Sequence, residues 1–117
     1  MKVVRTFEVE EIPNPHDISV RLLHVGEHEQ FEHLMLEPGE VQKKHAAYTT
    51  VHMYVLEGKG TLDVGDEIVQ ISADMLIGMP PETLHRLSNT GSTRLRVLNI
   101  KVPPPKRAPL IVVDQED

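Results

Sequence analysis

The sequence predicts an all-β protein, and three observations lead to that class. No stretch of helix length repeats apolar residues at the helical period, so helices are at most a minor part of the fold. About eight to ten short segments, rich in apolar and β-branched residues, recur at regular spacing. Turns of Gly, Pro, Asn and Asp separate these segments. Together the observations predict a β-sandwich or β-barrel.

The expected strands of the first half are residues 2–7, 18–25, 31–37 and 50–57. An acidic connection over residues 8–17 contains Pro13 and Pro15, and the turn pair Pro38-Gly39 ends the third strand. In the strand 50–57, alternation puts two sets of side chains on opposite faces. The sets are Val51, Met53 and Val55, and His52, Tyr54 and Leu56.

The expected strands of the second half are residues 61–64, 67–71, 74–79, 83–88 and 94–102. The two-residue turn Gly65-Asp66 predicts a hairpin, and Pro80-Pro81 separates the next two strands. Three prolines at 103–105 stop the sheet, because proline has no N–H to donate to it. Residues 103–117 form a Pro-rich tail, whose apolar run 110–113 we expect to pair with a sheet edge, that of a second subunit in our hypothesis.

Composition limits the class of protein. At 117 residues the chain is expected to form one domain, spanning residues 1–117. The net charge is -6 and no basic patch is evident, which argues against nucleic-acid binding. The absence of cysteine excludes disulfides, thiolate ligands and a cysteine nucleophile. No run has the length of a membrane span and no signal peptide is apparent, so we expect a cytoplasmic protein with no membrane partner.

Two motifs make residues 36–98 resemble the cupin superfamily. The first motif is Gly, five residues, His-x-His, three or four residues, Glu, six residues, Gly, and here Gly39, His45 and Gly58 match it. The second is Pro-x-Gly, two residues, His, three residues, Asn. Its matches are Pro80, His85 and Asn89, with Glu82 at the glycine position. The resemblance implies a double-stranded β-helix, the jelly-roll or cupin barrel. It also implies a homodimer, since small cupins commonly pair.

The resemblance further implies a divalent metal (Mn, Fe, Ni, Cu or Zn) in the barrel, held by three His and one Glu. This chain departs from that pattern at two positions, with Ala47 at the second histidine and Val51 at the glutamate. His45 and His85 remain as metal ligands by motif. The metal prediction therefore depends on a third ligand.

His52 is the nearest replacement, although alternation places it on the face opposite Val51. A β-bulge near Thr49-Thr50 would turn His52 inward and complete a three-histidine site. Without the bulge His52 points outward, and Tyr48, Tyr54, His33 or Glu82 would have to assist. The residues predicted to line the ligand pocket are Tyr48, Val51, Met53, Tyr54 and Glu82.

Other histidines and other chemistries have weaker signals. His33 is expected to hydrogen-bond a neighbour or face water, and no role is assigned to His16, His24 or His28. No serine has the glycine flanks of a nucleophile elbow, and the glycines are too dispersed to bind a phosphate. Two interpretations fit Lys43-Lys44 beside His45: attraction of an anionic substrate to the mouth of the barrel, or ordinary solvated lysines.

Two functional hypotheses follow. The first is a barrel that binds a divalent metal and a small polar organic ligand, with a metal-dependent reaction of unknown type. The second is a metal-free, non-enzymatic barrel that binds or senses a small molecule, which Ala47 and Val51 favour. Fold alone does not choose between them.

Overall fold

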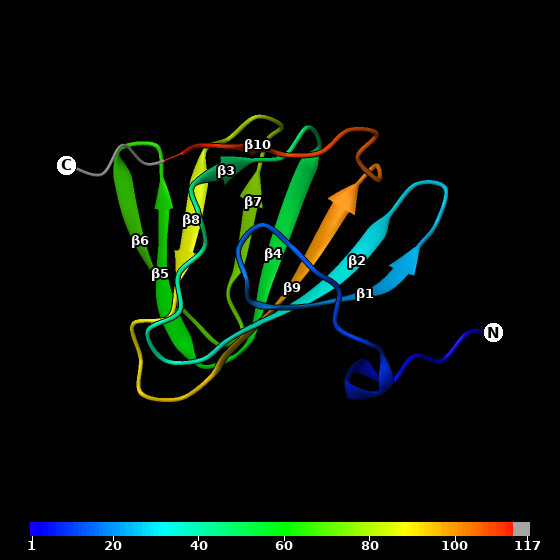
Figure 1. The fold of residues 1–117 in the computed structure, drawn as a ribbon, viewed down its shortest axis with the longest axis horizontal. Coiled ribbons are helices and arrows are strands. Elements are labelled where there is room, and N and C mark those ends of the chain that lie inside the picture. Colours follow the sequence, from blue (N-terminus) through cyan, green and yellow to red (C-terminus); the bar gives the residue numbers. More distant parts are fainter. Residues whose placement is uncertain (114–117) are drawn as a thin grey trace.

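A computed structural model describes residues 1–113 as two antiparallel five-stranded sheets (Figure 1). One sheet has the strand order β1-β2-β9-β4-β7 and the other β10-β3-β8-β5-β6. The strands of the first sheet are β1 (Ser19–Val25), β2 (Gln30–Leu36), β9 (Leu95–Val102), β4 (Thr50–Glu57) and β7 (Leu76–Met79). Those of the second are β10 (Leu110–Ile111), β3 (His45–Ala46), β8 (His85–Ser88), β5 (Lys59–Val64) and β6 (Glu67–Ser72). The predicted all-β jelly roll is therefore confirmed.

Alternation along the strands builds the core between the two sheets. In β4, Val51, Met53 and Val55 are at most 3% exposed, whereas His52 and Tyr54 are only partly buried. Leu62 and Leu87 bring the second sheet's inner face to the same core. Burial of these apolar side chains from both sheets is the main stabilising contribution.

Glycines allow the tight turns that hold the strands in place. The β5–β6 hairpin turns at Gly65-Asp66, as predicted, with Val64 opposite Glu67 and Gly65 at φ +59°. Gly58 between β4 and β5 has φ +86°, and a Cβ there would lie 2.3 Å from the Arg94 carbonyl oxygen. Only glycine fits this turn without displacing β9.

The prediction of a first strand over residues 2–7 is wrong. The only regular element in that range is the 3₁₀ turn η1 (Thr6–Glu8). The ring of Phe7 lies 5.1–5.6 Å from the guanidinium carbons of Arg21, Arg94 and Arg96 on the outer side of the first sheet. The segment thus packs through one aromatic side chain and its cation–π contacts rather than through a backbone ladder.

The C-terminal run pairs with a sheet edge of its own chain. Leu110 lies opposite Ala46 and Ile111 opposite His45, and the Val112 N–H donates to the Lys44 carbonyl oxygen (2.9 Å). The strand is shorter than the expected 110–113. Because β10 finds its partner within the chain, this tail gives no support to a second subunit. Residues 114–117 of the predicted tail lie outside the described residues.

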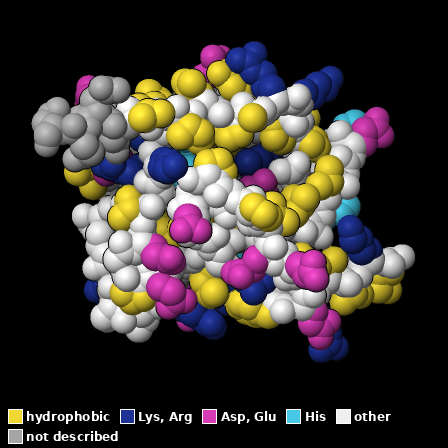
Figure 2. Space-filling view, viewed as in Figure 1, with side chains coloured by type: hydrophobic (Ala, Val, Ile, Leu, Met, Phe, Trp, Pro, Cys, Tyr) yellow, Lys and Arg dark blue, Asp and Glu magenta, His cyan; other side chains and the backbone are white. Residues whose placement is uncertain are grey.

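On the face shown in Figure 2, lysine and arginine side chains lie scattered among acidic ones and form no broad basic patch. This matches the net charge of -6. Across residues 1–113, no helix has the length and apolar character needed to cross a membrane.

Candidate functional site

His45 and His85 meet inside the barrel. They lie directly opposite one another in the β3–β8 pair, with ring centroids 4.2 Å apart and planes tilted by 49°. The exposed fractions are 8% for His45 and 3% for His85. Each ring thus enters the barrel at the start of a strand, which fixes its direction.

Backbone carbonyls fix the tautomer of both rings. His45 Nδ1 donates to the Lys43 carbonyl oxygen and His85 Nδ1 to the Thr83 carbonyl oxygen, both over 2.8 Å. Thr83 is itself held by a bond from its hydroxyl to the Pro80 carbonyl oxygen (2.7 Å). With the proton on Nδ1, each neutral ring keeps an accepting lone pair on Nε2.

Burial keeps these imidazoles neutral. Burial, with the neighbouring His85 as a second cause, lowers the pKa of His45 to about 3. Burial also lowers the pKa of His85, and Lys101 acts in the same direction. At neutral pH both rings are therefore bases and hydrogen-bond acceptors rather than cations.

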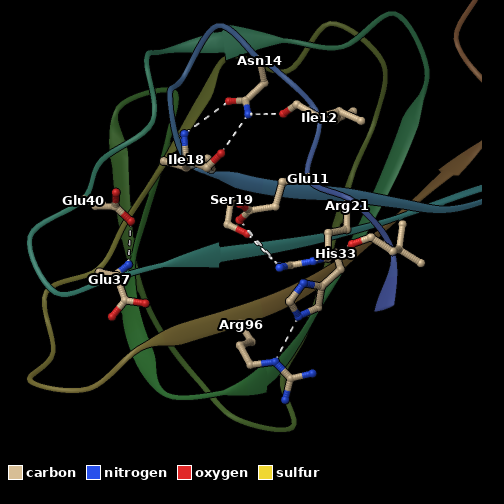
Figure 3. A network of polar contacts seen from close by, with 11 residues as sticks. Glu11, Ile12, Asn14, Ile18, Ser19, Arg21, His33, Glu37, Glu40 and Arg96 are labelled. Atoms are coloured by element: carbon tan, nitrogen blue, oxygen red, sulfur yellow. Dashed lines mark hydrogen bonds and ion pairs between the residues drawn. The ribbon is translucent and has the colours of Figure 1, made fainter. Parts of the chain in front are cut away.

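His16 is a third imidazole at this site, and sequence reasoning missed it. Its ring centroid lies 4.4 Å from that of His45. Asn14 shapes the loop that carries His16 (Figure 3): its side-chain amide donates to the Ile12 and Ile18 carbonyls, and its side-chain oxygen accepts from the Ile18 N–H. Burial, more than any neighbouring charge, lowers the pKa of His16 to about 4.

The tautomer of His16 differs from that of its neighbours. The Lys43 N–H donates to His16 Nδ1 (3.0 Å), so the neutral ring carries its proton on Nε2. Lys43 thus binds two of the three rings, His16 through its N–H and His45 through its carbonyl. At Nε2, therefore, His16 is a hydrogen-bond donor, whereas His45 and His85 are acceptors.

These rings line a cavity of about 220 Å³ inside the barrel. Glu32, Asn99 and Lys101 line the wall formed by the first sheet, and Ala47 and Val51 are among the apolar residues that complete the lining. Lys101 Nζ and Glu32 Oε2 form an ion pair at 3.1 Å. Asn99 is 6% exposed, and its side-chain oxygen has no hydrogen-bond partner among the described residues. Because that oxygen is itself buried, it offers no acceptor to the cavity.

A larger groove of about 560 Å³ lies between the N-terminal segment and β2, among the residues shown in Figure 3. Its lining includes Glu11, Glu37 and Glu40 but none of the seven histidines. Glu40 accepts from the Glu37 N–H, and Glu11 lies 3.7 Å from Arg21. Glu11 and Glu40 thus have protein partners, and the groove holds none of the imidazoles, so we place the candidate site in the smaller cavity.

His52 does not join the site. β4 pairs with β9 in unbroken register from Thr50 to Val55, so the bulge that would turn His52 inward is absent. The ring lies beside Gly78, where a Cβ would be 3.4 Å from His52 Nδ1. Val51 faces the cavity and His52 faces the other way, as strand alternation requires.

Of the five predicted pocket residues, only Val51 lines the cavity. The other four have different positions. Met53 is fully buried in the core, Tyr54 donates to Asp74 (3.2 Å) on the outer face, and the Tyr48 ring stacks under Arg107 (3.6 Å). Glu82 is exposed at φ +63°, the left-handed conformation that the glycine of the motif would adopt freely.

His33 lies in a separate cluster on the outer side of the first sheet. Its Nε2 accepts from Arg96 Nε (3.0 Å), as expected for an isolated histidine in a strand (Figure 3). Burial, followed by the charge of Arg96, lowers the pKa of His33 to about 4. It is not available to assist His45 and His85.

The residues present are a poor fit to a firmly held divalent metal. His45 and His85 suit one, because a ligating histidine usually donates its other N–H to a carbonyl. The remaining donors do not: His16 Nε2 carries a proton, and Glu32 is paired with Lys101. Within residues 1–113, no group of three His, Asp or Glu is arranged to hold a metal ion. Two imidazoles alone bind metals weakly.

Solved structures share this fold. The polyketide cyclase RemF from Streptomyces resistomycificus superposes with a TM-score of 0.84 at 20% identity, covering 100% of this chain and 89% of that one. The RmlC-like cupin family protein mj0764 from Methanocaldococcus jannaschii gives 0.74 at 26% identity, covering 91% and 94%. The likeness to RemF extends to the fold alone.

Comparison of sequences leads to the same family of folds. The uncharacterized protein MJ1618 of Methanocaldococcus jannaschii is 33% identical over 61 residues, 51% of this chain and 49% of that protein. The chain thus matches about half the length of that relative. The family model described as the cupin domain matches residues 32–101, which run from within β2 to within β9 and include both His45 and His85. The chain belongs to the cupin family.

Proposed function

We propose that this cupin binds a small polar organic molecule in the cavity between His45 and His85. The observation that carries the proposal is the pair of Nε2 lone pairs, held in one tautomer by the Lys43 and Thr83 carbonyls. Two acceptors that share one cavity favour a ligand with hydrogen-bond donors.

The dimensions of the cavity limit the ligand. Its volume of about 220 Å³ is below the ~300–1,000 Å³ of pockets for drug-sized molecules. Apolar side chains such as Val20, Leu34 and Val51 line part of it. The ligand is therefore a compact molecule with one apolar face and a few polar groups.

A screen of small organic molecules by thermal unfolding tests the proposal. A molecule that binds only the folded chain at 100 times its Kd stabilises it by about 2.7 kcal/mol. Ala47→Leu adds side-chain volume at the cavity wall and is the matched control. The proposal expects molecules that raise the melting temperature of the wild-type chain but not of A47L. It fails if no molecule discriminates between the two.

A metal-dependent enzyme is the second candidate. The observation that favours it is the Nδ1-to-carbonyl bond on both His45 and His85, the usual support of a metal-ligating histidine. Elemental analysis of protein purified without a His tag tests it. Stoichiometric Mn, Fe, Ni, Cu or Zn, lost in His85→Ala, would favour this candidate over the first.

We also propose a homodimer, on the resemblance to small cupins. Light scattering checks the mass directly, because one chain weighs 13.2 kDa. A mass of twice that value is expected, and a single-chain mass at micromolar concentration would refute the dimer.

A further inference from the structure

Lys101 is the only lysine or arginine among the described residues that line the cavity. It lies on the inner face of β9, and its side chain is 16% exposed. A charged group that is largely buried requires hydrogen-bonding or ion-pair partners. Glu32, 14% exposed, is its ion-pair partner.

The ion pair does not use all of the hydrogen-bonding capacity of Lys101. Its ammonium has three N–H bonds, and Glu32 Oε2 is the one partner found for them in residues 1–113. That same oxygen also accepts from Gln30 Nε2 (2.7 Å), so the carboxylate is shared between two donors. Lys101 retains N–H bonds for a further acceptor.

Lys101 lies where its remaining N–H bonds can be donated to a ligand in the candidate site. Lys101 lines the same cavity as His16, His45 and His85, and its charge lowers the pKa of all three rings. Across the strands, Lys101 is paired with Val51, which takes the place of the glutamate in the cupin motif. A fixed cation therefore stands beside a position from which the expected carboxylate is missing.

We propose that the ligand is a small hydroxy acid. Its carboxylate accepts from Lys101 Nζ, and its hydroxyl donates to Nε2 of His45 or His85. The inference rests on the proposed function and names the class of ligand for that same cavity. The Lys101 ammonium still has N–H bonds to donate, and it shares a cavity of about 220 Å³ with the neutral rings of His45 and His85, which accept.

Other ligand classes fit these groups less well. An organic cation would lie against the Lys101 ammonium, and Glu32 is already neutralised. A phosphate would bring up to two negative charges to one lysine that is already shared with a carboxylate. A neutral polyol would leave the remaining N–H bonds of Lys101 without a charged acceptor. A carboxylate adds one negative charge beside the ion pair, fewer than a phosphate can bring, and gives the remaining N–H bonds of Lys101 a charged acceptor.

Two lysines next to His45 in the sequence also favour an anionic ligand. Lys43 is exposed and acts on His16 electrostatically, and its neighbour Lys44 is partly exposed. Exposed lysines near a binding site raise the local concentration of anions.

Calorimetric titration with two matched pairs of probes tests the inference. The pairs are salicylate with salicylamide, and glycolate with glycolamide, in which the shape is kept and the charge is removed. The wild-type chain is compared with the double variant Lys101→Met/Glu32→Gln, which removes both charges of the pair and leaves no unpaired carboxylate. Lys59→Met, at an exposed lysine on β5, is the control.

We expect at least one acid to bind the wild-type chain and K59M about tenfold or more tightly than its amide, because a charge-assisted hydrogen bond is lost in the amide. In the double variant the preference for the acid over its amide should fall to less than about threefold, because the charge-assisted bond to Lys101 is no longer available to either probe. An amide that binds as tightly as its acid, or a preference that survives in the double variant, overturns the inference and leaves the proposed function standing. If neither acids nor amides bind and the thermal screen also finds no ligand, both proposals fail.

Discussion

The ring centroids of His45 and His85 lie 4.2 Å apart, on the neighbouring antiparallel strands β3 and β8 of the second sheet. Their Nδ1 atoms donate to carbonyls in the segments that lead into β3 and β8. Each approach segment thus positions a ring and also sets its protonation state. This relationship places two acceptors in one cavity.

The buried histidines predict a chain that loses stability in acid. The pKa of His45 is about 3 and those of His16 and His33 about 4, all below the ordinary value of 6.5. The unfolded chain therefore takes up protons first as the pH falls. The stability from these groups is fully present above pH 6.5, declines below it, and levels off near pH 3 to 4.

Nuclear magnetic resonance checks this directly. The ring signals of His45 should keep their neutral, Nδ1-protonated pattern from pH 8 to pH 5, and those of His85 should keep theirs to a lower pH than free histidine in the same buffer. A midpoint near 6.5 for either ring would contradict the burial and tautomer described above.

Restoring the two missing motif residues should create a metal site. Ala47 and Val51 both line the cavity beside His45 and His85, so A47H/V51E adds one imidazole and one carboxylate to the same space. We expect Zn²⁺ or Ni²⁺ to bind the variant about tenfold or more tightly than the wild-type chain.

The matched control for this gain is A47H/Y54E, in which the new carboxylate is on the outer face of β4. Equal metal affinity of the two variants, with both folded, would show that Val51 is not at the metal position.

Glu82→Gly should stabilise the chain. Glu82 has φ +63°, which costs a residue with a Cβ about 1–2 kcal/mol. Glycine removes that cost but loses roughly 0.5–1 kcal/mol through the greater freedom of the unfolded chain. The net gain should be about 0.5–1 kcal/mol in urea unfolding. Glu82→Ala keeps the Cβ and is the control; an equal gain in E82A would mean that backbone strain is not the cause.

Val112→Pro should loosen the strand that closes the second sheet. The substitution deletes the N–H that donates to the Lys44 carbonyl oxygen, a loss of about 1 kcal/mol. Val112→Ala, which keeps that N–H, should cost less. Hydrogen exchange of backbone amides in β10 should accelerate in V112P alone, and unchanged exchange would show that β10 is not held by this bond.

Much of the fold was predictable because its signals are local. The hairpin at Gly65-Asp66 and the alternating face of β4 both follow from short-range patterns that the structure retains. The first strand was mispredicted because its apolar residues suit a strand, whereas Phe7 instead packs among arginines that are distant in sequence. β3 has only two residues, too few for any periodic signal.

The candidate site was predictable only in part. His45 and His85 follow turns at fixed motif spacing, and the expectation that they converge came from that spacing. His16 has no motif, and it reaches the cavity only because its loop hydrogen-bonds the Lys43 N–H. Lys101 and Asn99 are inward-facing by strand parity, but only the three-dimensional register shows that they face the histidines.

The most direct test of ligand binding between the two rings is the ¹⁵N signal of their Nε2 atoms when the tightest small molecule from the thermal screen is added. Hydrogen bonding to the lone pairs should move the Nε2 signals of His45 and His85 together and leave that of His52, on the outer face, unchanged. Binding that leaves both cavity signals in place would contradict the account.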